Sequence, residues 1–130
     1  MDIRVGSRIP AVASAIGHAL LAFLPEEELE DVLRASRFER AGPGIPGSPE
    51  ALRVRLAEVR HDGMALTDWA SVNGLRVLAA PVLDRSCHAI AALSVAAPAM
   101  RASAEEFAAA VRVPLLARAG ELGLALAAAG

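Results

Sequence analysis

The side chains capable of catalysis or metal binding are few and lie far apart in the sequence. The three histidines are His18, His61 and His88, and no pair has the i, i+4 spacing with a nearby carboxylate that a helical zinc site uses. Cys87 directly precedes His88, but neighbouring residues on a strand point to opposite faces. We therefore expect neither a zinc or iron site nor a catalytic cysteine.

Two other groups of residues could bind a ligand rather than react with it. Ser94 is the only hydroxyl on one face of an otherwise apolar stretch, so it either bonds to backbone or faces a ligand. Thr67 and Asp68 come just before Trp69, the only tryptophan, and the segments that feed a sheet are where binding groups collect. The alternative is that Trp69 only covers a sheet edge.

Motifs of common enzyme and nucleotide-binding classes are absent from the sequence. It contains no G-x-S-x-G, no P-loop and no G-x-G-x-x-G, and no helix-turn-helix with a basic face. The residues by themselves predict an α/β domain that could hold a small molecule, without naming a function.

A hairpin is the predicted centre of the fold. The apolar runs Leu75 to Leu83 and Cys87 to Ala97 are joined by Asp84-Arg85-Ser86, which predicts two antiparallel strands covered on both faces. Pro81 cannot donate a ladder hydrogen bond, so we expect it at an edge or a bulge.

Helices and short strands are predicted around this hairpin. Apolar spacing from Pro10 to Leu24 predicts one amphipathic helix, Pro25 begins a second, and Ser48-Pro49 begins a third that Gly63 ends. A capping box at Ser103 and Glu106 predicts the last helix, which Pro114 should bend. Its expected inward residues are Phe107, Val111, Leu115 and Leu122. With strands at Asp2 to Val5 and Met64 to Asp68, the predicted order is strand, three helices, three strands, helix.

Composition limits the class of protein. The 130 residues fit a single domain, 1–130, that is 55% hydrophobic but only 3% aromatic. The net charge is -2 and the basic residues are scattered arginines without lysine, so this chain is not expected to bind nucleic acid directly. We expect no cofactor, no internal disulfide, no signal peptide and no membrane span, and hence a cytoplasmic protein.

Two ordered blocks resemble one known family. The first is Gly6-x-Arg8-x-Pro10 with Ala13-Ser14-x-x-Gly17-x-Ala19-Leu20-Leu21-Ala22-x-Leu24-Pro25. The second is Ala79-Ala80-Pro81-Val82-x-Asp84 with Ala91-Ala92-Leu93-Ser94-Val95-x-x-Pro98. Together they resemble the C-terminal effector-binding domain of IclR-family transcriptional regulators. The resemblance implies a GAF-like antiparallel sheet flanked by helices, in the α/β (α+β) class.

The resemblance also implies an effector pocket between the first helix and the sheet. Carried over to this sequence, its lining would be Ile9, Ala11, Ala15, Ile16, Thr67, Asp68, Leu75, Val77, Ser94 and Ala96. The chain departs from the family pattern at Val12, His18, Trp69-Ala70, Ser86 and Ala96-Ala97, and several polar pocket groups are lost. It also lacks the family's N-terminal winged helix-turn-helix and a strand-helix-strand portion, so we expect an N-terminally truncated member.

From this we predict a ligand-sensing regulatory domain and not an enzyme, with DNA binding left to the intact regulator. The mostly apolar lining favours an apolar or aromatic effector over a small organic acid. The unpaired strand Asp2 to Val5 and the uncovered apolar surface favour a homodimer. Two alternatives remain: a stand-alone interaction module with a closed pocket, and a cofactor-free enzyme that depends on Ser94 or Asp68.

Overall fold

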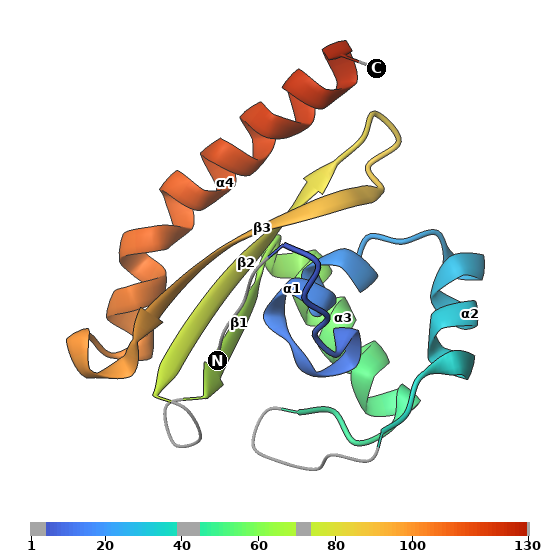
Figure 1. The fold of residues 1–130 in the computed structure, drawn as a ribbon, viewed down its shortest axis with the longest axis horizontal. Coiled ribbons are helices and arrows are strands. Elements are labelled where there is room, and N and C mark those ends of the chain that lie inside the picture. The colour runs from blue at the N-terminus through green and yellow to red at the C-terminus, as the bar shows by residue number, and fades with distance from the viewer. Residues whose placement is uncertain (1–4, 39–44, 70–73, 130) are drawn as a thin grey trace.

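The computed structural model describes residues 5–38, 45–69 and 74–129, and these form a small sheet between two groups of helices (Figure 1). The elements in chain order are η1 (Ala11–Ala13), α1 (Ala15–Leu21), α2 (Glu26–Ala35), α3 (Pro49–Asp62), β1 (Ala65–Trp69), β2 (Leu75–Leu83), β3 (Ala89–Pro98), η2 (Ala99–Arg101) and α4 (Ala104–Ala129). The mixed helix and antiparallel-sheet class is confirmed. Most of the predicted first strand, Asp2 to Arg4, lies outside the described residues.

The sheet is antiparallel, with β2 in the middle of the order β1-β2-β3. The predicted hairpin is β2 with β3, in a register that pairs Ala79 with Ser94 and Val77 with Ala96. Pro81 pairs only with β3, because β1 begins at Ala65 and its pairing with β2 reaches no further than Ala79. A bulge follows at Val82/Leu83. Pro81 therefore lies where β2 has no neighbour on the β1 side and next to a bulge, as predicted.

Each face of the sheet has its own helices. One face, formed by odd-numbered β1 and β2 residues such as Ala65 and Val77, packs against α1, with α2 and α3 beyond it. The opposite face, which includes Leu78, Ala80 and Val82, packs against α4. We call these the α1 face and the α4 face. The continuous apolar run of β2 is explained, because both of its faces are covered.

Alanines lie where α1 crosses the sheet. Ala19 of α1, Ala65 of β1 and Ala79 of β2 are all fully buried in one core cluster. Side chains this small let the helix backbone come close to the strands, which suits a sequence that is rich in apolar residues but poor in aromatic ones.

The residues predicted to cap α3 and α4 do so in the structure. The Ser48 hydroxyl accepts a hydrogen bond from the Ala51 N–H at 3.1 Å at the start of α3, and Gly63, with φ of 78°, ends that helix. Ser103 and Glu106 form the predicted reciprocal capping box of α4.

Three local predictions are wrong. The single helix expected from Pro10 is broken, because Ser14 is extended and caps α1 with its side chain. The hairpin loop runs from Asp84 to His88, since the Asp84 carboxylate accepts bonds from the Ser86 and His88 N–H groups and Cys87 has φ of 62°. Leu122 is 40% exposed, and the buried stripe of α4 continues instead through Ala119 and Gly123.

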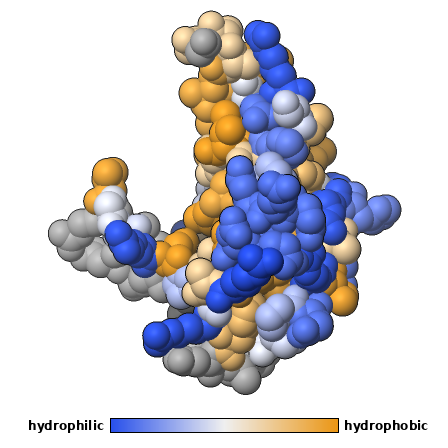
Figure 2. Space-filling model, turned by 90° about the vertical axis from the view of Figure 1, so that its right-hand side faces the viewer, coloured by the Kyte–Doolittle hydropathy of each residue, from blue (hydrophilic) through white to orange (hydrophobic). Residues whose placement is uncertain are grey.

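The C-terminal half of α4 carries much exposed apolar surface. This half of the helix runs along the hairpin to the end of the molecule (Figure 1), and Figure 2 shows hydrophobic residues along one side of this upper part, next to hydrophilic ones. Exposed apolar side chains here are Ile90, Leu122, Leu124 and Leu126. No helix in the described part of the chain is long and apolar enough to cross a membrane.

Candidate functional site

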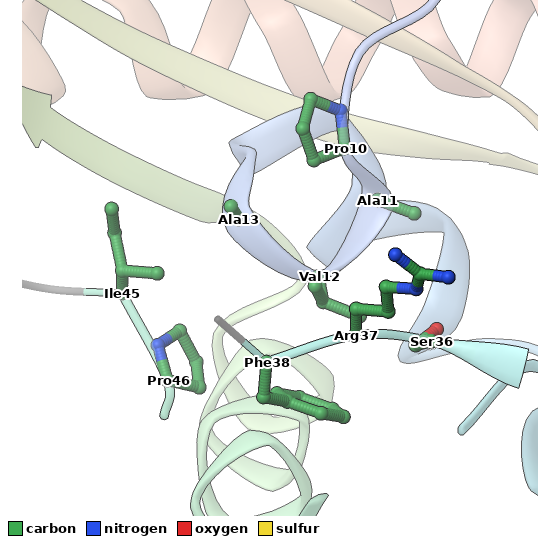
Figure 3. Close-up of a pocket in the computed structure, with 9 residues that line it drawn as sticks. All are labelled: Pro10, Ala11, Val12, Ala13, Ser36, Arg37, Phe38, Ile45 and Pro46. Atoms are coloured by element: carbon green, nitrogen blue, oxygen red, sulfur yellow. The ribbon is translucent and has the colours of Figure 1, made fainter. Parts of the chain in front are cut away.

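A surface cavity of about 340 Å³ lies between η1 and the two arms of the α2–α3 connection (Figure 3). Its lining comes from two stretches that are distant in sequence: Pro10, Ala11, Val12 and Ala13 on one side, and Ser36, Arg37, Phe38, Ile45 and Pro46 on the other. Pro10, Ala11 and Arg37 are exposed and form its rim, whereas Val12 and Ala13 are buried. The cavity is thus open to solvent and apolar at its base.

The position of η1 is fixed by α1. A Cβ built on Gly17 would lie 2.0 Å from the Ala11 carbonyl oxygen, so only glycine allows this close approach. The buried Ser14 hydroxyl accepts a hydrogen bond from the Gly17 N–H at 3.1 Å. These two contacts explain why Ser14 and Gly17 occur together in the first sequence block.

His18 supports η1 from below. Its Nε2 lies 2.9 Å from the Val12 carbonyl oxygen, and its Nδ1 lies 3.4 Å from the Nε of Arg55 on α3. The arginine can only donate, so His18 accepts at Nδ1 and donates from Nε2 to Val12 as a neutral ring. Burial lowers the pKa of His18; the bond to Val12 opposes this effect and the Arg55 charge adds to it.

The opposite wall is held by α2 and α3. The Ser36 hydroxyl, just after α2, donates to the Val32 carbonyl at 2.6 Å, and Phe38 packs against the core that α1 and α3 share. Arg53 of α3 pairs with Glu26 at 2.8 Å and with Glu30, both on α2. Arg37 is the one charged residue among those that line the cavity.

Most of the ten predicted site residues gather on the α1 face or on the elements that cover it. Thr67, Leu75, Val77, Ser94 and Ala96 occupy positions on that face, and Ala15 and Ile16 belong to α1, which packs on it. Ile9 and Ala11 lie before and at the start of η1, and of the ten only Ala11 lines the cavity.

Asp68 does not join this group. It follows Thr67 on β1, so its side chain points to the α4 face, where Arg76 is its cross-strand partner. The Arg76 Nε lies 3.2 Å from the Asp68 carboxylate, at an angle that makes the contact an ion pair rather than a hydrogen bond. The pair is on the face opposite α1 and η1. The predicted bridge after Trp69 falls on residues 70–73, outside the described residues.

Sequence reasoning missed the wall formed by Ser36, Arg37, Phe38, Ile45 and Pro46. The glycines and prolines between Phe38 and Gly47 indicate an irregular connection, and loops often carry binding groups. Nothing in local spacing shows that this loop returns to η1.

The described residues contain no group of three or more His, Cys, Asp or Glu side chains close enough to hold a metal ion. What the arrangement can do is enclose a small molecule between apolar walls, with a guanidinium at the rim. A model of one protein family, "Bacterial transcriptional regulator IclR C-terminal", matches residues 1–122. The chain belongs to this family.

The chain is similar to other IclR-family proteins in both sequence and fold. XynR of Escherichia coli K12, an HTH-type transcriptional regulator, is 37% identical over 105 residues, which cover 81% of this chain and 42% of XynR. The C-terminal domain of E. coli KdgR has a TM-score of 0.81 at 32% identity, covering 94% of this chain and 74% of that one. For Thermotoga maritima IclR the TM-score is 0.85 at 25% identity, covering 98% and 51%.

A further IclR-type structure contains a ligand. The inducer-binding domain of PobR from Acinetobacter, a double mutant in complex with 3-hydroxybenzoic acid, has a TM-score of 0.79 at 26% identity and covers 92% of this chain and 69% of that one. The present chain spans less than half of XynR, so it corresponds to part of such a regulator.

Proposed function

We propose that this chain is the ligand-sensing domain of an IclR-type regulator, not an enzyme, and that it binds its effector in the cavity beside η1. The observation that carries the proposal is the cavity itself, which has apolar walls and one charged group, Arg37. Its volume of about 340 Å³ is at the lower end of the range for small-molecule pockets.

The lining favours an aromatic or largely apolar effector. Val12, Phe38 and Ile45 offer apolar surface, whereas polar side chains are limited to Ser36 and Arg37. The sequence-based argument against an acid rested on a lining without a cation, and Arg37 supplies one. A single carboxylate on an aromatic ring therefore suits the cavity better than a small keto acid, which lacks the apolar body.

The test is calorimetry with three probes: benzoate, benzyl alcohol and pyruvate. We expect the two aromatic probes to bind more tightly than pyruvate. Ala11→Trp should abolish binding because the indole would fill the mouth of the cavity, and the matched control Ala57→Trp, on the exposed side of α3, should not. Arg37→Gln should weaken benzoate about tenfold and leave benzyl alcohol unchanged, whereas Arg34→Gln on α2 should affect neither.

One more variant separates the cavity from the space predicted between α1 and the sheet. Ser94→Trp would fill the α1 face, opposite Ala79, without touching the cavity wall. Unchanged binding in Ser94→Trp together with loss in Ala11→Trp supports the cavity. The reverse result would move the site to the sheet, and no binding of any probe by the parent would favour the module with a closed pocket.

Self-association is the second part of the proposal. The strand on which the homodimer prediction partly rested, Asp2 to Val5, falls mainly outside the described residues. The other ground, uncovered apolar surface, is present on α4. DNA binding would then belong to other parts of an intact, oligomeric regulator.

A further inference from the structure

Arg55 of α3 contacts both α1 and the sheet. Its Nε lies 3.4 Å from Nδ1 of His18 on α1, and its Nη2 donates to the Leu66 carbonyl on β1 at 2.6 Å. The Arg55 side chain is only 25% exposed, whereas Glu58, its ion-pair partner at 3.8 Å, is 61% exposed. An ion pair this exposed contributes little to stability. The position of the guanidinium is therefore set mainly by the ring and the carbonyl.

His18 extends these contacts to the effector cavity. Its Nε2 lies 2.9 Å from the carbonyl oxygen of Val12, which forms part of the cavity base. The guanidinium can only donate, so Nδ1 must accept, and the ring proton must be on Nε2, where it is donated to Val12. A connected set of hydrogen bonds thus runs from β1 through Arg55 and His18 to η1.

The other charged side chains on the elements that pack against α1 have different surroundings. η1 and β3 contain no charged residue, and β1 and β2 contain one each, both on the α4 face. Those of α3 other than Arg55 are exposed or bound to other partners. Among the described residues, Arg55 is therefore the one charge that contacts the ring of His18. The groups excluded in this way include Asp68 on β1, Arg76 on β2, and Arg53, Glu58 and Arg60 on α3.

We propose that Arg55 is a positioning residue for the effector cavity: it acts through His18 to hold the Val12 carbonyl, and with it η1, where the effector binds. This inference rests on the effector site proposed above. Arg55 does not itself line the cavity. Because the guanidinium is planar, its bond to the Leu66 carbonyl also fixes the direction in which Nε–H points at the ring.

Without Arg55, the ring of His18 would keep only one of its two polar partners. The ring could then rotate, or it could take up a proton at Nδ1, which burial disfavours but the arginine would no longer oppose. Either change weakens the hold on the Val12 carbonyl. The effector would then have to order η1 as it binds, and this ordering lowers affinity.

The first test is NMR of the histidine ring, and it needs no effector. At neutral pH the parent should have a neutral His18 with its proton on Nε2. Arg55→Met should raise the pKa of His18, because a positive charge beside the ring is removed, and should shift the backbone amide signals of Ala11 to Ala13. The matched control is Arg60→Met, which removes an α3 arginine that donates to the Ala22 carbonyl at 3.2 Å. It should change neither signal.

The second test is a double-mutant cycle measured by calorimetry with benzyl alcohol. This probe is uncharged, so loss of the arginine's charge does not act on it directly. Arg55→Met should weaken binding about fivefold, His18→Leu at least as much, and Arg60→Met not at all. Adding Arg55→Met to His18→Leu should cause no further loss, because Arg55 acts through the ring. A purely structural role through Leu66 would give the same loss in both backgrounds.

Additive losses in the cycle, a His18 proton on Nδ1 at neutral pH, or equal pKa values of His18 in the parent and Arg55→Met would each overturn the proposal. If His18→Leu does not fold, the NMR comparison of Arg55→Met with Arg60→Met decides the matter. Failure of every probe to bind the parent would contradict the proposed effector site, whereas the NMR result would still show whether Arg55 positions η1.

Discussion

At the scale of single residues, His18 and Gly17 control the shape of the candidate site without lining it. Both are buried on α1, and both contact the segment Ala11–Ala13 from beneath, one through a hydrogen bond to the Val12 carbonyl and the other through its missing side chain. The backbone of η1 forms one wall of the cavity, so its position depends on the residues that pack beneath it. Of these, His18 can titrate, and we therefore expect this wall to be sensitive to pH.

We expect the stability of the parent to fall as the pH is lowered through the ordinary pKa of histidine. The pKa of His18 is lowered from 6.5 by burial, so below pH 6.5 the unfolded chain binds a proton that the folded chain does not. Stability that is fully present above pH 6.5 is therefore lost as the pH falls towards the folded-state pKa. Urea unfolding at a series of pH values measures the slope.

In His18→Gln the free energy of unfolding should change less with pH over the same window. The titrating group is gone in this variant, while a hydrogen-bond donor remains. His61→Gln is the matched control, since His61 is exposed at the end of α3, and it should keep the slope of the parent. Equal slopes for the parent and His18→Gln would show that His18 does not carry this pH dependence.

Gly17→Ala should destabilise the protein by about 1–3 kcal/mol, the usual cost of overpacking a filled site. The new methyl would overlap the Ala11 carbonyl, so η1 must move. Chemical denaturation gives the stability, and the benzoate titration should show weaker binding as well. Gly47→Ala, where a Cβ meets nothing within 4 Å, should change neither. A tolerated alanine at position 17 would mean that η1 is not held by this contact.

At the scale of elements, Arg76 joins the sheet to the start of α4. Besides its ion pair with Asp68, its Nη1 donates to the carbonyl of Ala99, the first residue of η2, at 2.8 Å and to the carbonyl of Ala102, which directly follows η2. One side chain therefore orders the connection that sets where α4 begins on the sheet. The role of Asp68 follows from this: it balances a mostly buried arginine instead of facing a ligand.

Arg76→Met should lower stability by about 2 kcal/mol, since it removes charge-assisted hydrogen bonds to two carbonyls. Asp68→Asn should cost less, because the two carbonyl bonds of Arg76 remain. Benzoate affinity should be unchanged in Asp68→Asn. A large loss of affinity there, at unchanged stability, would return Asp68 to the binding site and contradict its assignment to the α4 face.

At the scale of the whole molecule, the sequence predicts what depends on local pattern. The order of elements from α2 onward, the hairpin pairing and the capping of α3 and α4 follow from apolar period and cap residues, and all are found. The predicted first strand, Asp2 to Val5, lies mainly outside the described residues. The break at Ser14 was missed because Val12 and Ile16 keep a helical spacing across it. The cavity was missed because its walls, Pro10 to Ala13 on one side and Ser36 to Phe38 with Ile45 and Pro46 on the other, meet only through the packing of α1, α2 and α3.

The fully buried alanines between α1 and the sheet have a consequence for how such a sensor could diverge. Replacing Ala65 or Ala79 by valine would push α1 outward, and Ser14 and Gly17 would carry η1 with it. The width of the cavity can therefore be altered from positions that do not line it. In an evolving lineage, a new effector preference could arise in the strands while the lining residues stay the same, so comparing only lining residues would not reveal it.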